Sequence, residues 1–156
     1  CKKTKYHTSM KTLIIYATYS GSTMMAAQAL EQVLQQAGHE VKLKMALETQ
    51  PSDFESFELV ILASPSWDYG GQEGMPHDDF MTMIDKFGEA KFNDQAFAIL
   101  GLGDSNYNKF CGAVDYLTQW IEKIGGKLVG QPLKIDQYFM NEQTANEEIQ
   151  RWGKTL

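Results

Sequence analysis

A run of small hydroxyl side chains stands between an apolar segment and a helical pattern. Residues 13–17 are apolar and β-prone, and from Met24 to Ala37 apolar residues recur at helical spacing. The uncharged segment between them reads Thr18-Tyr19-Ser20-Gly21-Ser22-Thr23. The start of a helix leaves backbone N–H groups unpaired, its dipole favours an anion, and hydroxyls add donors. The segment therefore predicts a phosphate-binding site.

Two well-known nucleotide motifs do not fit this segment. No Gly-Lys-Ser/Thr follows it, as a Walker A loop requires, and it lacks the Gly-x-Gly-x-x-Gly pattern of a dinucleotide turn. Without a lysine the phosphate would be held by neutral donors, which suits a tightly bound monophosphate. The segment alone is also compatible with an ordinary strand-to-helix turn in which a Ser or Thr caps the helix.

Two further segments combine polar residues with large aromatic side chains. Residues 64–74 follow an apolar strand and are expected to be non-regular, and residues 103–112 follow another such strand. They contain Trp67, Tyr69 and Tyr107, in surroundings too polar for a core. Because the carboxyl ends of parallel strands meet at one edge of a sheet, we expect all three segments to converge there. A phosphate cradle beside aromatic walls describes a site for a flat ring with a phosphate tail.

Strand and helix patterns alternate five times along the chain. This alternation predicts an α/β domain with a parallel sheet and helices on both faces. The expected strands cover residues 13–17, 41–45, 57–63, 96–102 and 128–135, the last interrupted at 130–132, and the expected helices cover 22–37, 76–87, 112–124 and 141–153.

Composition limits the classes of function. The net charge of -6 argues against nucleic-acid binding, which needs a basic face, but is compatible with a basic protein partner. Two cysteines are too few for a disulfide framework, so we expect a reducing, cytoplasmic setting. No apolar run approaches the roughly 18 residues of a membrane span. His7, His39 and His77 are scattered, and we expect no catalytic residue and no metal site.

Residues 1–9 differ from the rest of the chain. They are polar and basic without a hydrophobic period, and Met10 stands just before the first strand. We interpret residues 1–9 as an N-terminal extension, native or artificial, that is not part of the fold, and residues 10–156 as a single domain. A processed lipoprotein that begins at Cys1 is the alternative.

Together the three segments resemble the flavodoxin family over essentially all of residues 10–156. The first is similar to the family's phosphate pattern Ser/Thr-x-Thr-Gly-x-Thr, and residues 103–107 and 110–115 are similar to short-chain flavodoxins. The last strand lacks the insertion of the long-chain branch. The resemblance implies a flavodoxin-like three-layer sandwich with a five-stranded parallel sheet in the order 2-1-3-4-5. It also implies a low-potential one-electron carrier, acting as a monomer with redox partner proteins, and not an enzyme.

The resemblance implies a noncovalently bound FMN. Thr18, Ser20, Ser22 and Thr23, with backbone N–H groups of the loop, would hold its phosphate, and Trp67 and Tyr107 would cover the two ring faces. Backbone groups near Ser66, Asp68, Gly103 and Asp104 would meet the polar edge of the ring. The full set of residues expected at the cofactor adds Tyr19, Gly21, Tyr69, Gly70, Leu102, Phe110 and Cys111. Taken alone, Cys111 is typical of a buried core thiol.

The sequence departs from the family pattern at three positions. Ser20 stands where Thr is usual and Ser22 where Asn is common, and both keep a small hydrogen-bonding side chain. Asp68 stands where many short-chain members have Gly. The alternative functions are an FMN-dependent NAD(P)H reductase of quinones or nitro compounds on the same fold, and a relative that has lost FMN.

Overall fold

The buried strands alternate their side chains between two separate cores. The computed structural model describes residues 9–156, so the predicted extension 1–9 lies outside it except for Ser9. In β1, Lys11–Tyr16, the side chains of Leu13 and Ile15 enter one core and Ile14 enters the other. This period of two places an apolar strand between two helical layers.

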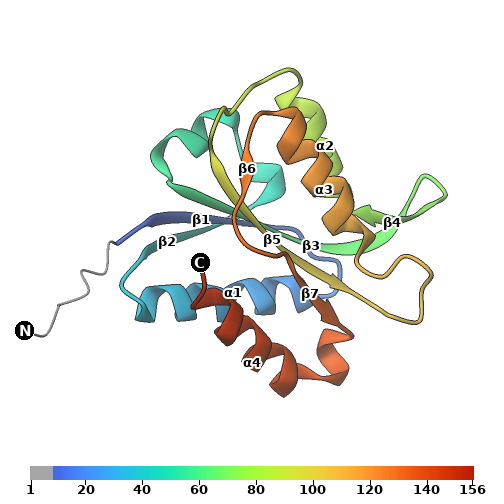
Figure 1. Cartoon of the computed structure of the whole chain (residues 1–156). Helices are drawn as coiled ribbons and strands as arrows, with labels where there is room; N and C mark the ends of the chain where they lie inside the picture. Colours follow the sequence, from blue (N-terminus) through green and yellow to red (C-terminus); the bar gives the residue numbers. More distant parts are fainter. Residues whose placement is uncertain (1–8) are drawn as a thin grey trace, which may run out of the picture.

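Helices cover both faces of the sheet (Figure 1). α1, Ser22–Gln36, and α4, Glu142–Gly153, pack on one face, and α2, Asp78–Phe87, and α3, Gly112–Lys123, pack on the other. The remaining elements are β2 Glu40–Met45, η1 Ala46–Glu48, η2 Pro51–Ser56, β3 Leu59–Tyr69, β4 Gln72–Pro76, β5 Ala96–Gly103, β6 Lys127–Leu128, β7 Leu133–Asp136 and η3 Tyr138–Met140. The predicted three-layer α/β sandwich is confirmed.

The strand order confirms the predicted topology once the strands are matched. The main path runs β2-β1-β3-β5-β6, all parallel, and β7 also pairs in parallel with β5. β6 and β7 are the two halves of the predicted last strand, separated by residues 129–132. The path therefore equals the expected order 2-1-3-4-5, with its switch point between β1 and β3.

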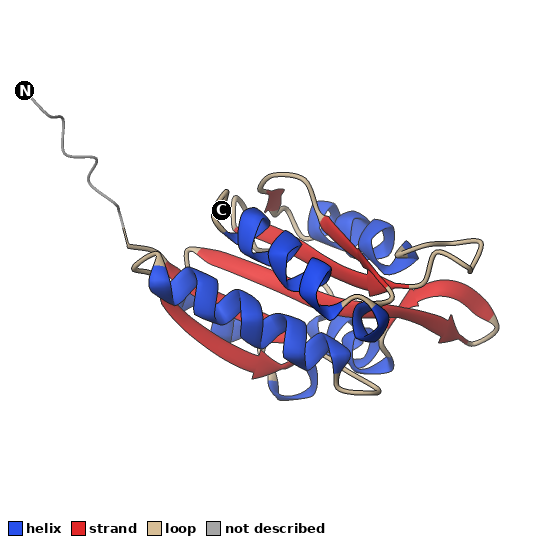
Figure 2. Cartoon of the chain, turned by 90° about the horizontal axis from the view of Figure 1, so that it is seen from below, coloured by secondary structure: helices blue, strands red, loops and turns tan. Residues whose placement is uncertain are grey.

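The prediction of a non-regular segment at 64–74 is wrong. β3 continues through Tyr69 and returns as β4 in an antiparallel hairpin, which reaches beyond the sheet (Figure 2). Gly70 and Gly71 have φ of 59° and 83°, as a two-residue hairpin turn with left-handed central positions requires. The exposed, mixed sequence of this ribbon lacks the apolar run that revealed the other strands. In the described part of the chain, no helix is both long and apolar enough to cross a membrane.

Candidate functional site

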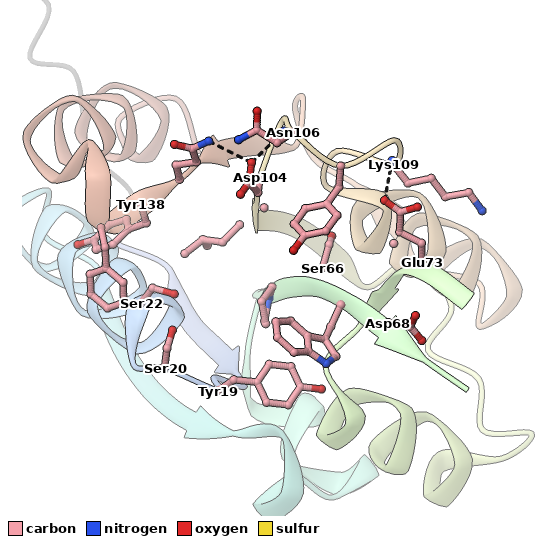
Figure 3. Close-up of a pocket in the computed structure, with 18 of the residues that line it drawn as sticks. Tyr19, Ser20, Ser22, Ser66, Asp68, Glu73, Asp104, Asn106, Lys109 and Tyr138 are labelled. Carbon is pink, nitrogen blue, oxygen red and sulfur yellow. Dashed lines mark hydrogen bonds between the residues drawn. The ribbon is translucent and has the colours of Figure 1, made fainter. Parts of the chain in front are cut away.

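A cleft of about 970 Å³ opens where the predicted segments meet (Figure 3). Its walls come from the loop before α1, the β3–β4 hairpin, the loop between β5 and α3, and η3. From the expected cofactor-binding set it is lined by Tyr19, Ser20, Ser22, Ser66, Trp67, Asp68, Leu102, Gly103, Asp104 and Tyr107. The three sequence segments therefore do converge on one hollow at the carboxyl edge of the sheet.

The loop before α1 leaves its donors available. Gly21, with φ 92°, precedes the helix, and its N–H donates to Oγ1 of Thr18 at 2.8 Å. No side chain caps the first turn of α1, and this turn contains no acidic residue. The sequence was also compatible with an ordinary turn in which a Ser or Thr side chain caps the helix, and the loop does not form such a turn. Thr18 and Gly21 shape the loop, while Ser20 and Ser22 border the cleft.

Thr23 contributes a buried hydroxyl without a partner. Its Oγ1 meets no hydrogen-bond partner within residues 9–156, although the residue is fully buried. A buried hydroxyl left unpaired costs about 1–3 kcal/mol. An acceptor that reaches the start of α1 would remove this cost, so the loop fits a phosphate group.

Two large aromatic side chains stand open at the cleft. Trp67 on the hairpin is 55% exposed and Tyr107 in the 103–112 loop is 64% exposed. Side chains of this size contribute most to folding when they are buried, so their exposure beside a hollow indicates a ligand surface. Their flat faces suit an aromatic ring.

The β5–α3 loop is held by Asp136, the last residue of β7, and by Gln137, which follows it. Asp136 accepts hydrogen bonds from the N–H and Oγ of Ser105 at 2.9 and 2.7 Å. The Asp104 carboxylate accepts from the N–H of Asn106 at 2.8 Å and from Nε2 of Gln137 at 3.0 Å (Figure 3). These two bonds lower the pKa of Asp104 below its usual range, and Asp104 therefore presents a negative charge to the cleft.

The hairpin is fastened to the start of α3. Oγ of Ser66 accepts a hydrogen bond from the N–H of Ala113 at 3.0 Å. Gly74 lies directly against Gly112: a Cβ built on Gly112 would stand 2.6 Å from the carbonyl oxygen of Gly74. Gly112 is therefore needed for this close backbone approach, while a Cβ on Gly74 would stand 2.8 Å from the Cβ of Lys109. Asp68 caps the hairpin turn, because its Oδ1 accepts from the N–H of Gly71 at 3.0 Å.

Seven members of the expected set do not line the cleft: Thr18 and Gly21, which shape the loop before α1, and five others. Thr23 is buried behind it, and Tyr69 and Gly70 lie in the exposed hairpin. Phe110 borders a smaller neighbouring hollow of about 220 Å³, and Cys111 is buried with its Sγ 3.9 Å from the carbonyl oxygen of the β7 residue Ile135. Burial raises the pKa of the Cys111 thiol to about 12, so the thiol is the inert core group that its sequence surroundings suggest.

Sequence reasoning missed the η3 wall and the neighbours of Tyr19. Tyr138, Phe139 and Met140 line the cleft, and Met140 is 79% exposed. The signal was available, because an aromatic and apolar triplet follows the last parallel strand at the same sheet edge. His77, to which the sequence analysis assigned no role, is buried and stacks on Tyr19 with ring centres 3.8 Å apart. Nothing in the sequence placed these two residues together.

Other site chemistries find no support in the described residues. Within residues 9–156, no group of three or more His, Cys, Asp or Glu side chains is arranged to hold a metal ion. Lys109 is the one cationic side chain among the residues that line the cleft. A bound anion would therefore depend on hydroxyls and backbone N–H groups.

Comparison with known proteins agrees with this geometry. The flavodoxin family model matches residues 14–152. A flavodoxin of Maridesulfovibrio salexigens is 31% identical over 147 residues, which cover 94% of this chain and 96% of that protein. The solved structure of oxidised flavodoxin 2 from Bacillus cereus has a TM-score of 0.82 at 25% identity, covering 93% of this chain and 96% of that one. The flavodoxin of Fusobacterium nucleatum, solved bound to flavin mononucleotide, shares the fold with a TM-score of 0.77 at 22% identity, covering 93% and 95%. The chain belongs to the flavodoxin family.

Proposed function

We propose that this protein carries single electrons between redox proteins by means of a noncovalently bound FMN. The observation that carries the proposal is the meeting of an uncapped, hydroxyl-rich helix start with two exposed aromatic rings at one cleft. Bound FMN supplies the redox chemistry, and the chain supplies its position and electrostatics. Flavodoxins carry electrons rather than transform a substrate, so the reductase alternative is not retained.

The loop before α1 would hold the phosphate. Hydroxyls of Ser20, Ser22 and Thr23 and the free N–H groups of the first turn are the available donors. The dipole of the fifteen-residue helix α1 adds a favourable field for an anion. Thr18 acts indirectly, because its Oγ1 accepts from Gly21 and fixes the loop.

The two exposed aromatics would hold the ring. Trp67 and Tyr107 offer faces for stacking, while backbone groups of Asp68, Gly103 and Asp104 offer partners for the polar edge. The Ser66 hydroxyl is occupied by Ala113, so Ser66 is expected to contribute through its backbone.

Acidic side chains would set the potential low. Asp68, Glu73 and Asp104 all line the cleft, and Asp104 stays ionised because its hydrogen bonds lower its pKa. Negative charge beside the ring opposes the build-up of further negative charge on reduction. A low reduction potential follows.

The same charges suggest the kind of partner. The net charge is -6, and Asp78 and Asp79 stand at the start of α2, where the Asp78 carboxylate accepts a hydrogen bond from the cleft residue Tyr19. We expect docking to proteins with a basic face, by a monomer, in the cytoplasm. Electron transfer to such a partner should slow as salt concentration rises, and a rate independent of salt would refute the electrostatic part of the proposal.

One spectroscopic experiment tests the function. The purified protein, or the apoprotein mixed with FMN, should show the visible absorbance bands of an oxidised flavin, and should take up two electrons in separate steps during reductive titration. With NADPH alone it should be reduced slowly, and rapidly once a reductase protein is added. A colourless protein that does not bind added FMN would refute the proposal, and rapid NADPH turnover without a partner would favour an enzyme.

A further inference from the structure

Tyr19 connects the loop before α1, which is the proposed phosphate site, to the hairpin that carries Trp67. Its ring stacks on His77 with centroids 3.8 Å apart and an interplanar angle of 23°. On another side it contacts the ring of Trp67, with centroids 4.9 Å apart and an angle of 43°. The three rings come from the loop before α1, the N-terminal cap of α2 and the end of β3.

The Tyr19 side chain is held at its far end. Its hydroxyl donates to Oδ1 of Asp78 at 2.8 Å and accepts from the N–H of the same residue at 3.2 Å. Burial, with a further contribution from the Asp78 carboxylate, raises the pKa of Tyr19 to about 12, so the hydroxyl remains a donor at every physiological pH. His77 is itself fixed, because it is 5% exposed and its Nδ1 accepts from the N–H of Asp79 at 2.9 Å.

Trp67, in contrast, has little support of its own. It lies where β3 has left the sheet, and the hairpin register shifts between Trp67 and Tyr69. In the described part of the chain, Tyr19 is the one aromatic ring in contact with it. An exposed side chain on such a ribbon keeps rotamer freedom unless a neighbour restricts it.

We propose that Tyr19 is a positioning residue that holds the Trp67 ring at the cleft. It thereby links the loop before α1 to the side of the cleft that would bind the flavin ring. This inference rests on the proposed function, because it assumes that Trp67 stacks on the flavin. Ordering the Trp67 ring before binding lowers the entropy lost when the flavin enters. Tyr19 then strengthens binding of the ring through the Trp67 side chain.

A double-mutant cycle measured with riboflavin separates this role from phosphate binding. Riboflavin lacks the phosphate, so its affinity for the apoprotein reports on the ring alone. Tyr19→Leu should weaken riboflavin binding about three- to tenfold in the native background and less than about twofold in a Trp67→Ala background. Tyr19→Phe keeps the aromatic ring but loses the hydrogen bonds to Asp78. Its affinity for riboflavin should therefore lie between the affinities of the native protein and of Tyr19→Leu. Tyr116→Phe removes a tyrosine hydroxyl on α3, away from the cleft, and should leave the affinity unchanged.

A measurement on the apoprotein tests the contact without flavin. The indole N–H resonance of Trp67, assigned by its absence in Trp67→Phe, should shift and sharpen in Tyr19→Leu as the ring loses its neighbour. Equal losses of riboflavin affinity in both backgrounds, or an unmoved indole resonance, would overturn the role of Tyr19 and leave the proposed function standing. Failure of the native apoprotein to bind either flavin would instead overturn the proposed function, and with it this role.

Discussion

Thr12 and Thr23 share a property that separates them from the other described polar side chains: each has a fully buried Oγ1 with no hydrogen-bond partner in residues 9–156. They differ in place. Thr12 lies within β1, whereas Thr23 lies in the first turn of α1 behind the cleft. The pair therefore allows the cost of an unpaired hydroxyl to be compared with and without a ligand nearby.

Thr23→Val should change stability and affinity in opposite directions. Removing an unpaired buried hydroxyl should raise the free energy of unfolding of the apoprotein by about 1 kcal/mol. The same change should weaken FMN binding by about 1.5–3 kcal/mol, because a hydrogen bond to a charged group is lost. Urea unfolding of the apoprotein and fluorescence titration with FMN and riboflavin measure the two effects.

Thr12→Val is the matched control. It should stabilise the apoprotein in the same way and leave the FMN affinity unchanged. The double variant Ser20→Ala/Thr23→Ala should weaken FMN strongly and riboflavin little. Equal weakening of both flavins would place the phosphate elsewhere.

The aromatic walls should differ in their effects on potential. Tyr107→Ala should weaken FMN and raise the second reduction potential, because an electron-rich face no longer opposes the reduced anion. Trp67→Ala should lower the affinity through lost stacking area, by about 1–3 kcal/mol. Spectroelectrochemistry and flavin titration check both. Native affinity and potentials in both variants would show that the ring lies elsewhere.

Asp68 should lower the first reduction potential through its charge. Asp68→Asn keeps the oxygen that accepts from the N–H of Gly71 and removes the negative charge. If the charge disfavours the first reduction by about 1 kcal/mol, its removal should raise the first reduction potential by roughly 40 mV. Asp68→Gly also frees the backbone of the hairpin and should raise the potential further. If Asn reproduces the whole shift seen with Gly, backbone freedom has no part in it. If neither variant changes the potential, Asp68 does not lie beside the ring.

Cys111 should resist thiol reagents until the fold opens. Burial raises its pKa from 9.0 to about 12, so at pH 9 its thiolate is a small fraction of that in the unfolded chain. We expect alkylation of the peptide that contains Cys111 to be roughly 100-fold slower in native protein than in denaturant, as mass spectrometry would measure. Because the pKa is raised on folding, the thiol contributes stability below about pH 9, and this contribution is lost as pH rises toward 12. Rapid alkylation of native apoprotein at pH 8 would contradict this.

The parallel sheet could be predicted because its strands carry a strong signal. Residues 59–63 and 97–100 are buried on both faces, and such strands must be apolar throughout. The β3–β4 hairpin could not be predicted in the same way. Its residues are mostly exposed, and the turn at Gly70 and Gly71 is consistent with either a hairpin or a loop.

Some parts of the candidate site could be predicted from the sequence for the same reason, and others could not. The hydroxyl loop and the exposed aromatics follow their strands directly, so the topology alone brings them to one edge. The Tyr19–His77 stack and the Gln137–Asp104 hydrogen bond join segments 58 and 33 residues apart, through side-chain geometry that no local pattern encodes. The η3 wall was predictable in principle, because it too follows a strand.

The contact between Gly74 and Gly112 joins two of the segments that build the cleft. One glycine belongs to the hairpin strand that returns from Trp67, and the other begins α3, directly after the loop that carries Tyr107. There is no room for a Cβ on Gly112, and the Ser66–Ala113 hydrogen bond lies alongside, so the hairpin packs closely against the start of α3. This backbone contact therefore helps to set the separation between the two segments that carry Trp67 and Tyr107.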